Sequence, residues 1–233
     1  MSQIELTEAQ QCLVDAGKVL MIGKHSEEIP ESERNMIWRG FAGNFGNKGL
    51  ACTMLRDDGI VLIITEGDVS REVLRHEFIH AAQCHASPET MKSALDAAIQ
   101  VGQLLVSAIR AKLTANPECE KGHRDLAMAE QQWKMQADGS ATVAAFPVFQ
   151  FYQDLYPTNE TAELASEILG FDYPRGAYAA MTACLAAECG YEIDPMSDLA
   201  RELVAYTFEH LEHEIIDELM AEAGQSPDTQ LRM

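Results

Sequence analysis

The sequence predicts a mostly helical α+β fold with one small sheet, and three observations support this. Two short apolar or β-branched runs flank a turn-forming Asp-Asp-Gly at 57–59, which predicts a hairpin near residues 51–65. A segment with helix-capping residues follows the hairpin directly. Helical periodicity dominates most of the remaining chain. We expect one domain over residues 1–233, with the hairpin packed on the helix that follows it and residues 87–190 as a largely helical insertion.

The helix that follows the hairpin is predicted to run from near Val69 to near His85. Asp68 or Ser70 can accept a hydrogen bond from its first turn. Apolar side chains within it provide a face for packing on the sheet. The other predicted helices are Thr7 to about Met21, Ser87-Pro88 to Leu113, Arg124 to Ala137, Thr161 to Leu169, Ala177 to Glu188, and a helix that starts near Ser197 and stops at Gly224.

The predicted helix after the hairpin carries the pentapeptide His76-Glu77-Phe78-Ile79-His80. Residues four apart lie on one face of an α-helix, so the two histidines can offer ring nitrogens to a single metal ion. Glu77 follows the first histidine and projects beside that position. The arrangement is the H-E-x-x-H pattern, which predicts a zinc site with its own general base. The alternative is a pair of histidines on an ordinary helix.

A catalytic zinc site needs a third protein ligand and an open fourth position. We expect Glu202 as this ligand, because a carboxylate in an apolar helix segment is costly unless it is paired or bound to metal. At 100° per residue, Glu202 shares a stripe with Tyr206, Glu209 and His213. The alternatives for the third ligand are Glu209, Glu163, Glu167 or a histidine.

The segment from His76 to Gln83, together with the later Glu202-Leu203-Val204-Ala205-Tyr206, resembles the zincin metallopeptidases with a gluzincin-type ligand set. It is closest in style to small intracellular metallopeptidases of bacteria and phages, including those that cleave repressor proteins. The resemblance implies peptide-bond hydrolysis, with His76, His80 and Glu202 as zinc ligands and Glu77 as the base. The chain differs in having over a hundred residues between the second histidine and Glu202, and no recognisable DNA-binding or sensor module.

The residue types suit a hydrolytic mechanism. Zinc lowers the pKa of a bound water to about 7, and Glu77 would take the proton as the water attacks a carbonyl. Tyr206 is the expected side-chain donor to the oxyanion. The alternatives for this donor are His210, His213, Tyr178 and Tyr191. The segment Ala51–Arg56 is a candidate edge strand against which an extended substrate could pair.

Charge and composition limit the partners. The formal net charge is −20, and residues 188–228 hold twelve acidic side chains against one basic side chain, Arg201. Such a surface repels nucleic acid and anionic membranes, so we expect a peptide or protein substrate and neither of those partners. The first residues lack the basic and apolar regions of a secretory signal. We therefore expect a cytoplasmic protein, in the host cytoplasm if a phage encodes it; the sequence predicts no oligomeric state.

The six cysteines include no C-x-x-C pair and are expected to be reduced. Cys84 with His85, or Cys119 with His123, is an alternative second metal site. Two other functions also remain open. A deformylase-like hydrolase would take a cysteine upstream of the motif, such as Cys52, as its third ligand. A non-catalytic binding or regulatory protein could keep a zincin fold without the activity.

Overall fold

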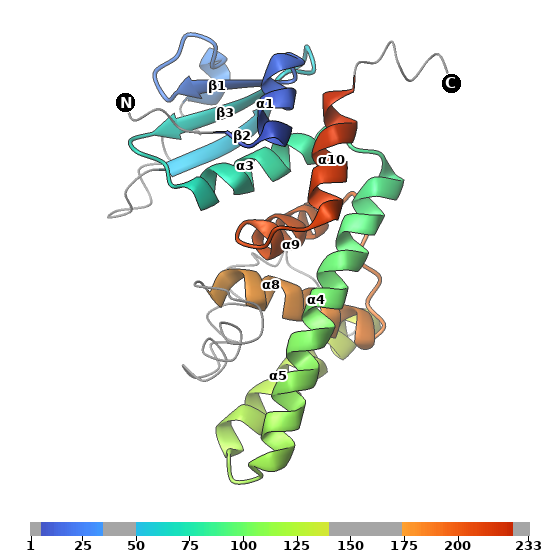
Figure 1. Cartoon of the computed structure of the whole chain (residues 1–233). Helices are drawn as coiled ribbons and strands as arrows, with labels where there is room; N and C mark the ends of the chain where they lie inside the picture. Colours follow the sequence, from blue (N-terminus) through green and yellow to red (C-terminus); the bar gives the residue numbers. More distant parts are fainter. Residues whose placement is uncertain (1–5, 35–49, 140–173, 226–233) are drawn as a thin grey trace. The chain divides into compact units, whose positions relative to one another are not determined.

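The structure is a computed structural model of the whole chain, and it describes residues 6–34, 50–139 and 174–225. The chain divides into two compact units. The first, which we call the sheet unit, contains Met1–Ser87 and Ile216–Met233. The second, the helical unit, contains Pro88–Ile215. Within the described residues the structure is mixed α/β and mostly helical, with a three-stranded sheet, in agreement with the predicted class (Figure 1).

The sheet has the strand order β1-β3-β2, formed by β1 (Val19–Gly23), β2 (Leu50–Leu55) and β3 (Val61–Glu66). β2 and β3 are antiparallel, with Thr53 opposite Ile63, so the predicted hairpin is confirmed. Its turn contains Gly59 at φ +81°, a left-handed conformation that glycine adopts without strain. The backbone N–H of Gly59 donates to the carbonyl of Arg56 at 3.0 Å and closes the turn.

The first predicted helix is shorter than expected, and a strand follows it. α1 spans Glu8–Asp15, and Thr7 and Gln10 cap it reciprocally. The prediction that this helix continues to Met21 was wrong. Gly17 takes φ +68°, which ends the helix, and β1 begins at Val19. β1 runs parallel to β3, with Val19 opposite Val61, so pairing with a distant strand overrides the local helical pattern.

The central strand β3 is buried on both faces. Its residues Val61 to Ile64 are all 0% exposed, as expected for a continuous apolar run in the middle of a sheet. One face packs against Ile29, which forms a buried cluster with Leu62 and Ile64. The helix α3 (Arg71–Gln83) packs on β2 and β3 (Figure 1). The sheet therefore provides the support on which α3 is seated.

The helical unit is built from α4 (Pro88–Ala115), α5 (Glu120–Ala137), α8 (Pro174–Glu188) and α9 (Asp198–Phe208). α4 packs on α8 and α9, and α8 also contacts α5. The predicted helices in these regions are confirmed, although α5 begins at Glu120, before the predicted Arg124. The predicted helix Thr161–Leu169, which holds the alternative ligands Glu163 and Glu167, lies outside the described residues.

The last predicted helix is divided in two. α9 ends at Phe208, and α10 begins at Glu214 and ends at Gly224, so the prediction of one helix to Gly224 was wrong. In the segment between them, Nδ1 of His213 accepts a hydrogen bond from the backbone N–H of Ile215 at 3.2 Å. This bond satisfies a donor in the first turn of α10, which a continuous helix would have satisfied internally. His213 consequently does not continue the stripe of Glu202 and Tyr206.

α4 is the one helix in the described part of the chain that is long and apolar enough to span a membrane by length and composition. Ten of its residues are buried, and it packs on α8 and α9. A core helix of a soluble protein meets the same criterion. The expected absence of a membrane partner stays a prediction.

The crossing of α4 and α8 depends on Gly102. A Cβ atom at this position would lie 1.9 Å from the backbone oxygen of Ala180 and 2.8 Å from Cβ of Cys184. Backbone cannot move aside as a flexible side chain can. The two helices therefore approach as closely as their backbones allow, and only glycine fits at this point.

We expect Gly102→Ala to lower the free energy of unfolding by about 1–3 kcal/mol through overpacking. Helix propensity alone predicts the opposite sign, since alanine favours a helix over glycine by about 1 kcal/mol. Urea denaturation of both proteins measures the difference. Gly23→Ala is the matched control, because a Cβ there meets no atom within 4 Å. A Gly102→Ala protein as stable as the parent would contradict the close crossing.

Candidate metal centre

The helix that carries the motif is fixed at its start and on one face. Oγ of Ser70 accepts a hydrogen bond from the backbone N–H of Val73 at 3.3 Å, so Ser70 and not Asp68 is the N-cap. The buried apolar side chains of α3 hold the helix in place on the sheet unit. They are Leu74, Phe78, Ile79, Ala81 and Ala82. These contacts set the direction in which the motif side chains project.

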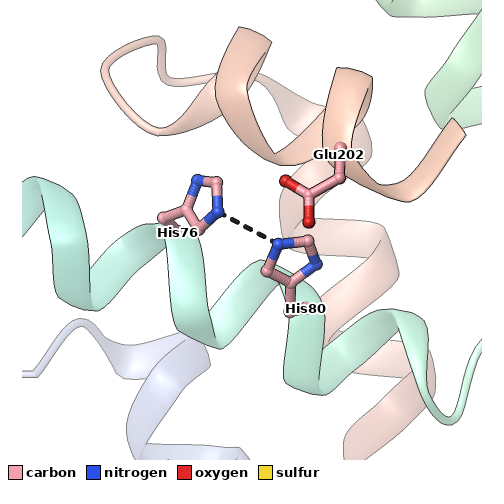
Figure 2. Close-up of side chains that lie close together, drawn as sticks. All are labelled: His76, His80 and Glu202. Carbon is pink, nitrogen blue, oxygen red and sulfur yellow. Dashed lines mark hydrogen bonds between the residues drawn. The ribbon is translucent and has the colours of Figure 1, made fainter. Parts of the chain in front are cut away.

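The two motif histidines meet on one face of α3. Nε2 of His76 and Nε2 of His80 are 3.0 Å apart, and the ring planes are at 81° to each other (Figure 2). His76 is buried, and His80 is partly buried. Two ring nitrogens this close can share only one proton between them. A cation can take the place of that proton and accept a lone pair from each ring.

The separation of the two nitrogens suits a zinc ion. Two ligands about 2.0–2.1 Å from a tetrahedral zinc lie roughly 3.3 Å apart. The observed 3.0 Å between the His76 and His80 nitrogens is close to this value. A small rotation of either ring would bring the two nitrogens to that distance.

Nδ1 of His80 is 2.9 Å from Oε1 of Gln83, a contact that the sequence reasoning missed.

His76, His80 and Glu202 form a group that could hold a metal ion, with their ligand atoms all within 4.8 Å of one another (Figure 2). Glu202 comes from α9, which Ser197 caps by accepting from the backbone N–H of Ala200. In the described ranges no other cluster of three or more such ligands occurs. The alternative third ligand Glu209 and the pairs Cys84–His85 and Cys119–His123 therefore belong to no such cluster there.

The carboxylate of Glu77 is held from the sheet. Glu77 is 7% exposed, and the hydroxyl of Thr53 lies 2.7 Å from its Oε2 and 3.1 Å from its backbone oxygen. Thr53 is on β2, so the bond joins the sheet to the motif helix. Sequence reasoning missed this residue. The only signal available was the alternation along β2, which gives neighbouring residues opposite faces.

The same alternation directs Cys52 away from the motif. Thr53 faces α3, whereas Cys52 packs with Ile64 and Ile29 on the other face of the sheet. Burial, with a smaller contribution from the charge of Glu77, raises the pKa of Cys52 to about 11. The direction of its side chain, away from the motif histidines, argues against Cys52 as the third ligand.

The candidate oxyanion donors lie in several environments. Tyr206 is 7% exposed and belongs to a core cluster with Tyr178, Ala179, Ala183 and Leu203. The ring of Tyr191 is tilted at 49° to that of Trp133, with 5.2 Å between the ring centroids. Nε2 of His210 is 3.3 Å from the carboxylate of Glu209. The catalytic role of Tyr206 stays a prediction, and its packing is that of a core residue.

We expect Thr53→Val to lower the free energy of unfolding by about 1.5–3 kcal/mol, because a buried carboxylate loses its donor. Thr53→Ser keeps the hydroxyl and should recover most of this loss. Thr65→Val is the matched control, since the hydroxyl of Thr65 bonds only a neutral backbone oxygen, that of Ile22, at 3.3 Å. Equal losses from Thr53→Val and Thr65→Val in urea denaturation would show that the bond to the Glu77 carboxylate contributes no more than a bond to a neutral backbone oxygen.

No family model, no curated protein and no solved structure matches this chain. The zincin resemblance therefore rests on the motif residues of the sequence, and the fold is described from the structure alone.

Proposed function

We propose that this protein is a zinc-dependent peptidase of the zincin type that acts inside the cell. One observation carries the proposal. Two imidazole nitrogens converge at 3.0 Å on the face of a buried helix, and a buried carboxylate, Glu77, follows the first histidine directly. This combination of two neutral ligands and an adjacent base is what hydrolysis assisted by a metal requires.

The proposed ligands are Nε2 of His76, Nε2 of His80 and the carboxylate of Glu202. Two imidazoles and one carboxylate favour zinc or a similar transition metal, whereas magnesium and calcium prefer oxygen ligands throughout. Three protein ligands also leave one position of a tetrahedral ion open, as catalytic zinc sites do. The donor set therefore supports a catalytic zinc site more than a closed structural one.

When bound, zinc would supply Lewis-acid chemistry that makes water more acidic and a substrate carbonyl more electrophilic. The chain's own residues would do the rest. The carboxylate of Glu77 would accept the proton of the attacking water and deliver it to the nitrogen of the departing amine. The hydroxyl of Thr53, 2.7 Å from Oε2, holds that carboxylate in a defined rotamer. The base is thus oriented before a substrate arrives.

The position of β2 supports an extended peptide as the substrate. In the sheet as far as it is described, β2 pairs on one side with β3 and forms the edge. An extended chain can add to such an edge through backbone hydrogen bonds alone. Because Thr53 of this strand contacts Glu77, a peptide paired along β2 would run beside the base. The net charge of −20 makes nucleic acid an unfavourable alternative substrate.

The metal content of purified variants tests the ligand set. We expect stoichiometric zinc in the parent and in Cys52→Ser, and loss of most zinc in His76→Ala, His80→Ala and Glu202→Ala, because each removes one of three ligands. Inductively coupled plasma mass spectrometry after dialysis gives the ratio. Circular dichroism checks that each variant is folded. Full zinc in the Glu202→Ala protein would move the third ligand to another residue, and loss of zinc in Cys52→Ser would favour the deformylase-like alternative.

The base is tested separately from the metal. We expect Glu77→Gln to keep zinc but to lower the rate of peptide hydrolysis by about 10²–10⁴, the usual contribution of general acid–base catalysis. The substrate is a mixed-sequence peptide library, and mass spectrometry identifies new termini. A zinc chelator should abolish cleavage by the parent. A parent protein that holds zinc yet cleaves no peptide would instead indicate a non-catalytic metal-binding protein.

A further inference from the structure

Gln83 contacts the second motif histidine on the side away from the shared focus. Its Oε1 lies 2.9 Å from Nδ1 of His80, and the residue is 1% exposed. We propose that Gln83 is a positioning residue that holds His80 with its proton on Nδ1. In this form Nε2 of His80 presents a lone pair toward Nε2 of His76 and is ready to bind a metal.

The proton assignment follows from the partner atoms. A neutral imidazole carries one N–H, on Nδ1 or on Nε2. The amide oxygen of Gln83 can only accept, so Nδ1 of His80 must donate to it. Nε2 of His80 is then left with its lone pair, which faces Nε2 of His76 at 3.0 Å. Gln83 thus selects which nitrogen of His80 is available.

The position of Gln83 makes this control effective. It lies three residues after His80 on the same helix, so the two side chains are neighbours on the α3 surface. Its burial keeps the amide out of bulk water, which would otherwise compete for the Nδ1 proton. The bond also restrains rotation of the His80 ring. A ring held in this way loses less entropy when a metal binds.

The effect on metal affinity of removing such a hydrogen bond can be predicted from other metal sites. Ligating histidines commonly donate their second N–H to an acceptor, and removal of that acceptor weakens metal affinity about 10–100-fold. The prediction of weaker zinc affinity rests on the metal site proposed above. The prediction of the proton position on His80 does not depend on that metal site, because it concerns the protein without metal. The two parts can therefore fail separately.

The proton position is measured by nuclear magnetic resonance on metal-free protein labelled with ¹⁵N-histidine, at about pH 8, where an ordinary imidazole is neutral. The chain has seven histidines, and His80→Ala identifies the His80 signals. We expect the Nδ1–H form in the parent and in Gln83→Glu, which keeps an acceptor, and its loss in Gln83→Leu. A proton on Nε2 of His80 in the parent would overturn the proposal, and that measurement needs no Gln83 variant to fold.

Zinc affinity is measured by competition with a coloured chelator. We expect Gln83→Leu to bind zinc about 10–100-fold more weakly, and Gln83→Glu to bind at least as tightly as the parent. Gln10→Leu is the matched control: it removes another buried glutamine, which caps α1 and is hydrogen-bonded to Thr7 rather than to either motif histidine, and it should leave zinc affinity unchanged. An unchanged affinity in Gln83→Leu would contradict the positioning role. If the parent carries the proton on Nδ1 of His80 but binds no zinc, the proposal of a zinc peptidase is refuted. The proposal that Gln83 sets the position of the His80 proton then still holds.

Discussion

The structure of the candidate site depends on a single turn of α-helix. His76 and His80 are four positions apart, and helical geometry brings their Nε2 atoms to 3.0 Å. A strand would place that pair more than 10 Å apart along the chain, at about 3.3 Å per residue. The burial of α3 on β2 and β3 keeps this turn in place, so the packing of the sheet unit is what maintains the geometry of the imidazoles.

Two hydrogen bonds give the polar side chains of α3 defined orientations. Glu77 is held from β2 by Thr53, and His80 is contacted by Gln83 from the following turn. Buried polar groups are costly without partners, and these bonds reduce that cost. They also restrict the rotamers of the carboxylate and the ring. Contacts within the sheet unit therefore help to order the face of α3 that carries the chemistry.

Local patterns in the sequence predicted the hairpin, a start of α3 capped by Asp68 or Ser70 and the shared face of the two histidines, because short-range geometry determines all three. The strand β1 was missed, since its partner β3 lies more than forty residues later and leaves no mark on the local pattern. The end of α9 was missed because a histidine ring, that of His213, satisfies a backbone donor there. The contacts of Thr53 and Gln83 depend on exact side-chain directions, which periodicity does not give.

The hydroxyl of Thr53 has two acceptors on the same residue, Oε2 of Glu77 at 2.7 Å and the backbone oxygen of Glu77 at 3.1 Å. It carries one proton, and its O–H can rotate between them. If the carboxylate turns away or becomes protonated, the hydroxyl can move its bond to the carbonyl and remain satisfied. The hydroxyl on the neighbouring strand thus keeps an acceptor in either state of the acid side chain, which one fixed acceptor would not allow.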